Sequence, residues 1–299
     1  MKSFIKSSIS DKVYLLTIWT FIGIFTLAIV FPLLHVVSAS FSSPRALVAG
    51  RVFLLPVEPG LQGYASVFRN SQVWSGYWNS IVYTTLATII GTMVTVTGGY
   101  VLSRKEFPLR NFLTVFFAIT MFFSGGMLPT FMLIRNLGML DTMWALILPG
   151  ALSVWLAIIA RTFIAHTIPE ELFESVSLDG GGYYVHFFQI VLPLSKALLA
   201  VLAINFAVGQ WNSFFSALIY LHTPDKFPLQ IILRNILISH QIDFATITGG
   251  EALVMVERQQ LAELMKYSLI IVSSIPLLIV YPFIQRYFIK GIMIGSLKG

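Results

Sequence analysis

The chain has 299 residues, of which 57% are apolar or aromatic and only 11% are charged, and its mean hydropathy is +0.83. Soluble domains carry about 25% charged residues, so this chain has too few polar side chains to cover a water-exposed fold. The net charge of +6 is scattered, without the basic cluster typical of nucleic-acid binding, and we expect no nucleic-acid partner. The absence of cysteine excludes disulfides, thiol catalysis and Cys-ligated metal sites. The composition indicates an integral membrane protein.

Six long charge-free windows predict six transmembrane helices. Each window has at least 19 residues, close to the roughly 20 that cross about 30 Å of hydrocarbon as a helix. The windows lack the period-two alternation of barrel strands, so we expect an all-α fold in one transmembrane domain, residues 13–299. The first window is too long for a cleavable signal, whose apolar core has roughly 7–15 residues. We place the spans near residues 14–37, 80–103, 112–134, 143–164, 197–221 and 268–288.

The placement of lysine and arginine predicts the orientation, because cytoplasmic loops are enriched in both. With residues 1–12 as a cytoplasmic N-terminus, both termini lie inside. Eleven basic residues then fall in the inside segments 1–12, 104–111, 161–196 and 286–299, and eight fall in the outside segments 38–79, 135–142 and 222–267. The two long outside loops, 38–79 and 222–267, are open to two interpretations, a contact with an extracytoplasmic protein or a solvated cap.

The inside segment 167–193 predicts a cytoplasmic helix–turn–helix. Thr167 and Glu170 have the spacing of a capping box, with Pro169 between them. Carboxylates in the first turns complement the helix dipole, and here they are those of Glu170, Glu171 and Glu174. Asp179 and the three glycines that follow it predict the turn. A second short helix, about 183–190, is expected to end before Pro193.

One face of the first short helix is apolar, since Leu172, Phe173 and Val176 recur at spacings of three and four. An exposed apolar ridge flanked by acids suits docking into a groove of a soluble partner. The alternative is a helix resting on the lipid surface, although such helices favour lysine and arginine.

The same segment resembles the EAA motif of ABC importer permeases, which reads Glu-Ala-Ala, three residues, Gly, nine residues, Ile-x-Leu-Pro. The matching residues are Glu174-Ser175-Val176, Asp179-Gly180 and Ile190-Val191-Leu192-Pro193. Gly180 follows Val176 by four positions, and Ile190 follows Gly180 by ten, so the spacing fits. Ser175 and Val176 replace the two alanines of the motif, a departure that bears on the shape of the docking helix.

Further stretches extend the resemblance over nearly the whole chain, to the carbohydrate-uptake branch of these permeases. They are residues 137–142 with 144–149, 209–215, 225–230, and 285–291 with 297–299. The resemblance implies a subunit that pairs with a second, usually different, permease in the bacterial cytoplasmic membrane. It implies two ABC ATPase subunits that use ATP and Mg, and an extracytoplasmic solute-binding protein that delivers a carbohydrate. An oligosaccharide is favoured, and a uronate-containing one is an option.

The resemblance also implies which residues couple the chain to its ATPase. Glu174 would pair with a basic residue of the ATPase, and Gly180 would allow the turn between the short helices. The expected coupling residues are Glu170, Glu171, Glu174, Ser175, Val176, Asp179, Gly180 and Pro193. No Gly-x-x-x-x-Gly-Lys-Ser/Thr loop occurs in the sequence, so we expect a non-catalytic chain that binds no cofactor itself.

Substrate contacts are expected in the fifth span, where polar groups are costly unless they face a partner or a watery path. The candidates are Asn205, Gln210, Trp211, Asn212 and Phe214. Hydrogen bonds between helices and simple packing explain them equally well. We expect no metal site, because the five histidines are too dispersed. A self-sufficient secondary carrier is the alternative function, but carriers generally have paired repeats and charged midplane residues.

Overall fold

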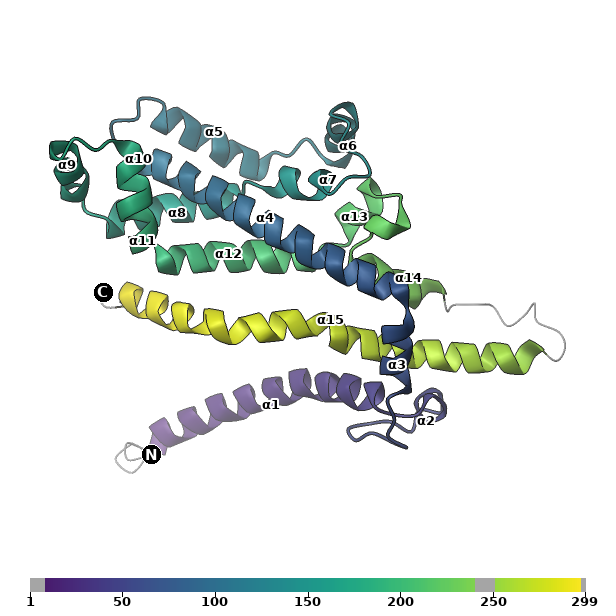
Figure 1. Cartoon of the computed structure of the whole chain (residues 1–299). Helices are drawn as coiled ribbons and strands as arrows, with labels where there is room; N and C mark the ends of the chain where they lie inside the picture. Colours follow the sequence, from purple (N-terminus) through teal and green to yellow (C-terminus); the bar gives the residue numbers. More distant parts are fainter. Residues whose placement is uncertain (1–8, 240–250, 297–299) are drawn as a thin grey trace. The chain divides into compact units, whose positions relative to one another are not determined.

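A computed structural model describes residues 9–239 and 251–296 of the chain, with the side chains near the ends of these segments left out (Figure 1). This part of the chain is helical and contains no strand, which confirms the all-α prediction. Three of its helices are long and apolar enough to cross a membrane, or up to six spans exist when each of three bent helix pairs counts as one. The centre of the second outside loop and the last residues of the C-terminal motif lie outside the described residues.

The described chain forms two compact units. The first comprises residues up to Asn70 with 233–274, and the second comprises 71–232 with the residues from Ile275 onward. Two helices contribute to both units, α14 (Leu229–Ser239) and α15 (Glu251–Ser296).

The first unit contains α1 (Ile9–Ser40), α2 (Pro44–Val48) and α3 (Gln62–Arg69). The turn after α1 is held by serine hydroxyls: Ser43 caps α2 by accepting from the Ala46 N–H, and Ser42 accepts from the Val57 N–H. Ala39, Ala46 and Val52 form a small buried core beneath this turn. The segment 38–79, expected from the sequence to lie outside, is therefore an ordered structure over most of its length.

The second unit is built on α4 (Ser71–Ser103), which packs against α8 (Val154–Thr167) and α12 (Lys196–Trp211) (Figure 1). Gly99 brings α4 and α8 together at the level of the backbone, because a Cβ there would lie 2.5 Å from the Ala160 Cβ and 2.9 Å from the Arg161 nitrogen. Buried Val96, Ala160 and Leu202 continue the contact among the three helices.

Three of the expected continuous spans are interrupted, which corrects their helix boundaries. The span at 112–134 divides into α5 (Arg110–Phe122) and α6 (Met127–Asn136), bent by 115°. The span at 143–164 divides into α7 (Trp144–Ile147) with the 3-10 turn η2 (Leu148–Gly150), and α8, bent by 47°. The span at 197–221 divides into α12 and α13 (Phe215–Tyr220).

Local chemistry explains the breaks. Gly126 has φ +82°, a conformation that glycine adopts without steric cost. Ser153 caps the start of α8 by accepting from the Leu156 N–H. Asn212 ends α12 with both its backbone N–H and its side-chain amide directed at the Val208 carbonyl. Absence of charge marks a segment as apolar, but it does not detect these helix ends.

The close approach at Gly99 generates a stability prediction. We expect Gly99→Val to lower the free energy of unfolding of the purified chain by about 1–3 kcal/mol, the usual cost of overpacking. The measurement is denaturant unfolding in detergent. Gly98→Val is the matched control, since a Cβ at Gly98 meets nothing within 4 Å. Equal stability of the two variants would contradict a backbone contact between α4 and α8.

Candidate functional site

The segment 167–193 folds as two short helical pieces joined by a glycine turn. The first piece is α9 (Glu171–Leu178). The second comprises α10 (Tyr183–Val185), the π-helix η3 (His186–Val191) and α11 (Leu192–Leu194). Gly180 has φ +78°, and the Gly181 N–H donates to the Val176 carbonyl at 2.8 Å. The turn thus requires a left-handed residue at Gly180, the arrangement expected at a helix C-terminus.

The predicted capping box is wrong. Thr167 is the last residue of α8, and Ile168 is extended, so the threonine hydroxyl belongs to the preceding helix. Glu170 stands at the N-cap of α9 without a side-chain capping bond. Its carboxylate instead accepts from the Lys105 ammonium at 2.8 Å and lies 3.9 Å from the Arg104 guanidinium. The Lys105 bond lowers the pKa of Glu170 and raises that of Lys105.

The apolar face of α9 is turned toward its own chain, which corrects the expected exposed ridge. The Phe173 ring stacks on Tyr183 with centroids 4.9 Å apart, and the Arg104 guanidinium lies 4.1 Å from its centroid. Leu172 packs against the buried core of the second unit. Leu178, 89% exposed, and Tyr184, 83% exposed, are the large apolar side chains of this segment that solvent reaches most.

The acids of this segment divide into two groups. Glu170 is engaged within the chain, whereas Glu171 and Glu174 are exposed and form no ion pair with any described residue. A second link supports the segment from behind, because the Tyr100 hydroxyl of α4 lies 2.9 Å from Nδ1 of buried His186. Burial lowers the pKa of His186. The exposed acids therefore belong to a segment whose two helical pieces are each linked to the region at the end of α4, α9 through Glu170 and η3 through His186.

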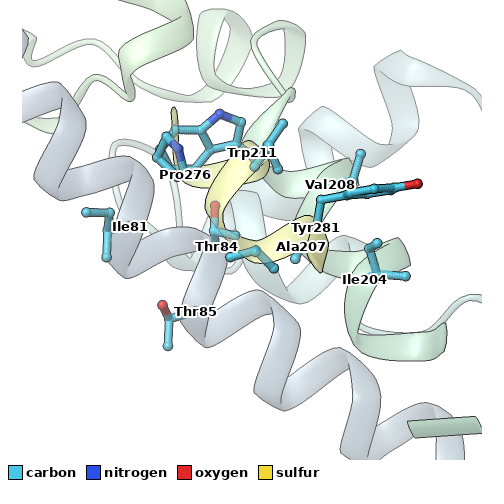
Figure 2. Close-up of a pocket in the computed structure, with 11 residues that line it drawn as sticks. Ile81, Thr84, Thr85, Ile204, Ala207, Val208, Trp211, Pro276 and Tyr281 are labelled. Carbon is cyan, nitrogen blue, oxygen red and sulfur yellow. The ribbon is translucent and has the colours of Figure 1, made fainter. Parts of the chain in front are cut away.

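A cavity of about 300 Å³ lies between α4, α12 and the part of α15 that belongs to the second unit (Figure 2). Its size is at the lower end of the range for small-molecule sites. Thr84 and Thr85 supply hydroxyls, and Trp211 and Tyr281 supply aromatic rings. None of the described residues that line it is charged. Trp211 is buried, and its ring meets Tyr77 edge-on, with centroids 5.8 Å apart.

Of the five expected substrate-contacting residues, Trp211 alone lines this cavity. Asn205 and Asn212 are exposed, and each donates its side-chain amide to a carbonyl four residues earlier in α12, at 2.8 and 2.9 Å. Gln210 and Phe214 do not line the cavity. These asparagines thus satisfy their donors within one helix rather than between helices. The sequence reasoning missed Thr84, Thr85 and Tyr281, although hydroxyls inside an apolar span were a usable signal.

The comparisons with known proteins agree with this architecture. The polygalacturonan/rhamnogalacturonan transport system permease protein YtcP of Bacillus subtilis (strain 168) is 35% identical over 292 residues, which cover 97% of this chain and 99% of the relative. Protein LplC of the same organism is 36% identical over 270 residues, 90% of each chain. The chain belongs to the sugar-transport permeases of ABC transporters. No family model matches it.

A solved structure gives the same result for the fold of the permease. A chain of a bacterial ABC transporter involved in the import of the acidic polysaccharide alginate matches with a TM-score of 0.85 and 30% identity, over 94% of this permease and 99% of that chain. The relatives are permease subunits of transport systems, so the chain is a membrane transport subunit rather than an enzyme.

At the opposite end of α4, two of the motifs that carry the family resemblance meet in the permease. Asp141, with φ +56°, accepts from the N–H groups of His222 and Thr223 at 2.9 and 3.0 Å. Its other oxygen accepts from the Thr223 hydroxyl and the Lys226 ammonium, both at 2.7 Å. These bonds, that of Lys226 above all, hold the pKa of Asp141 well below its usual range. We call Asp141, Thr223 and Lys226 the loop clasp.

The loop clasp generates a prediction about pH. Because the folded pKa of Asp141 lies below its ordinary value of 3.8, the clasp is fully present above about pH 4 and is lost only as pH falls through the lower folded value. Protection of the His222 and Thr223 amides from hydrogen exchange should therefore persist unchanged from pH 7 to pH 4. Asp141→Asn tolerates the positive φ but turns an amide donor toward Lys226, and should speed this exchange several-fold. Asp225→Asn, at an exposed position on the same loop, is the control.

Proposed function

We propose that this permease forms, together with a second permease, the ATP-driven uptake pathway for an oligosaccharide in a bacterial cytoplasmic membrane. Two ABC ATPase chains, which hold ATP and Mg, dock against the segment 167–193, and a solute-binding protein delivers the sugar to the other side. Both termini then lie in the cytoplasm. The observation that carries the proposal is the exposed acidic surface of α9, anchored from behind to α4, in a chain that matches sugar permeases over nearly its full length.

The docking surface consists of Glu171, Glu174, Leu178 and Tyr184, all exposed on α9 and α10. Carboxylates beside exposed apolar side chains suit a groove with basic walls. We assign Glu174 the pairing with a basic ATPase residue. Glu170 acts differently from Glu174, because its bond to Lys105 transmits displacement of α9 to the end of α4.

The remaining residues of the motif support the shape of the docking surface. The Ser175 hydroxyl donates to the Leu172 carbonyl at 3.0 Å, and the Ser175 carbonyl accepts from the Asp179 N–H. The Val176 carbonyl closes the turn at Gly180. Pro193 lies in α11, where the second helical piece leads toward α12. The Val176 side chain packs on the turn, because a Cβ at Gly181 would lie 2.7 Å from Val176 Cγ1.

For the substrate, we propose that the cavity beside Trp211 forms part of the sugar pathway. The faces of Trp211 and Tyr281 suit the apolar faces of sugar rings, and the Thr84 and Thr85 hydroxyls suit sugar hydroxyls. A uronate-containing oligosaccharide is one option for the substrate, because similar proteins are named for polygalacturonan, rhamnogalacturonan and alginate. With no cation among the described lining residues, the carboxylates of such a sugar would have to be neutralised by the partner permease. Asn205, Gln210, Asn212 and Phe214 remain candidates for contacts in the assembled pathway.

The first test is ATPase activity of the assembled permeases and ATPases in lipid, with the solute-binding protein and a panel of neutral and uronate-containing oligosaccharides. We expect stimulation of several-fold by one class of sugar and its binding protein, which would name the substrate class. Lack of stimulation by every sugar, with a loaded binding protein and an intact assembly, would contradict the carbohydrate proposal. Uptake by this chain alone, driven by an ion gradient, would favour the secondary carrier.

The second test concerns the docking acid. Glu174→Lys should leave insertion and assembly intact but abolish sugar-stimulated ATPase activity, because it places a positive charge opposite a basic partner. Asp225→Lys inverts an acidic charge in the same way at an exposed position outside the segment 167–193, and should retain most of the activity. If Glu174 only stabilised the start of its helix, the substitution would remove at most about 1 kcal/mol of helix stability. Sugar-stimulated ATPase activity would then be nearly normal.

A further inference from the structure

A second cavity, of about 370 Å³, lies beside the docking segment and is lined by residues from the end of α4, the start of α5, the end of α8, the beginning of α9 and η3. Its polar lining comprises Ser103, Arg104, Lys105, Arg110, His166, Glu170 and His186. We call it the basic pocket. Neither the sequence motifs nor the proposed docking surface accounts for it.

The acids near the basic pocket do not balance its cations. Glu106 accepts from Arg104 at 3.1 Å, and Glu170 accepts from Lys105 at 2.8 Å. Arg110 has no carboxylate partner among the described residues, and it lies close enough to Arg161 to repel it electrostatically. Three cations and one carboxylate line the pocket, and Glu106 pairs with Arg104 from outside the lining, so one positive charge, that of Arg110, is left unbalanced.

Two donors at this pocket are buried without an acceptor. The Nε groups of Arg104 and Arg110 are both inaccessible, and neither has a hydrogen-bond partner within the described chain. An unsatisfied buried donor is costly, and a guanidinium donor more so, because its charge strengthens every bond that it fails to make. Two arginines that line one cavity, each with a buried Nε group that has no acceptor, point to a missing anion.

We propose that the basic pocket binds a phosphate group, carried either by the headgroup of an anionic phospholipid or by a free phosphate ion. The planar guanidinium presents its donors in a fork that matches phosphate oxygens, and the Lys105 ammonium adds charge without demanding a fixed geometry. A bound phosphate supplies acceptors to Arg110 and Arg104 and neutralises the excess charge. This site is additional to the proposed function. It depends on the proposed function in one respect only, the side of the membrane from which a lipid headgroup would reach the pocket.

Binding at this pocket would also act on the docking segment. Arg104 lies over the Phe173 ring and near Glu170, so an anion that holds its guanidinium holds the start of α9 as well. Phosphate or lipid would thereby reduce the motion of α9 relative to the end of α4.

The experiment uses the full-length chain and two probes. Radiolabelled inorganic phosphate is measured by equilibrium dialysis against the chain in phosphatidylcholine nanodiscs, with chloride holding the ionic strength constant. Phosphatidylglycerol is measured as lipid retained in native mass spectra after release from mixed phosphatidylglycerol and phosphatidylcholine vesicles. Arg110→Gln should weaken binding roughly tenfold or more, as loss of a charge-assisted pair predicts. Arg135→Gln removes the same charge from an exposed site on α6 and should bind like the wild type.

Arg110→Lys keeps the charge and serves where Arg110→Gln fails to fold; it should bind with an intermediate affinity. Phosphate binding in neutral lipid identifies the free ion, and retention of phosphatidylglycerol alone identifies the headgroup. Failure of the wild type to bind either probe, or equal binding by Arg110→Gln, Arg110→Lys and the wild type, would overturn the site. Sugar-stimulated ATPase activity of Arg110→Gln, measured in the assembly with the second permease, the ATPases and the solute-binding protein, separates the two proposals. Activity that persists without anion binding would leave the proposed function intact.

Discussion

The backbone contact between α4 and α8 at Gly99 is the constraint on which the second unit depends. A helix of 33 residues extends for about 50 Å, and both of its ends make specific contacts. Near its beginning, Asn79 donates to the carbonyls of Asp225 and Phe227, and the Tyr83 hydroxyl donates to that of Lys226. At its end, Tyr100 and Arg104 hold the docking segment. One rigid element thus connects the loop clasp with the exposed acids of α9.

The uncharged cavity lies on the same helix, α4, that contacts the loop clasp at one end and the docking segment at the other. Thr84 and Thr85 lie less than two turns beyond Asn79, so under the proposed docking at α9 a shift of α4 would also move the hydroxyls of the cavity. The lining is suited to weak, adaptable contacts with sugar rings and hydroxyls, because it contains no charge among the described residues that would hold a substrate tightly. A transport pathway requires such moderate affinity, since the substrate must also leave.

Those features that follow from solvation or from local backbone geometry could be predicted from the sequence. Hydrocarbon excludes charge, so the charge-free windows located the apolar helices. The turn at Gly180 was predicted from Asp179 and the glycines that follow it, because glycine readily adopts the left-handed conformation. Helix ends inside apolar windows were not predictable by this route, because Asn212 satisfies its donors locally and adds no charge. The lining of the cavity was also missed, since Thr84 and Tyr281 meet only in the folded chain.

The three glutamates at the start of α9 show most clearly where local reasoning ends. Each lies in the first turn, so each gains the same benefit from the helix dipole, and sequence alone gives them one role. The fold separates them, because the end of α4 delivers Lys105 to Glu170 but leaves Glu171 and Glu174 facing solvent. An acid that is already paired contributes little attraction to a partner, whereas an unpaired one contributes its full charge. Under the proposed function, recognition and transmission therefore fall to different carboxylates at the start of one helix. The contact that separates them is a surface ion pair between segments 65 residues apart.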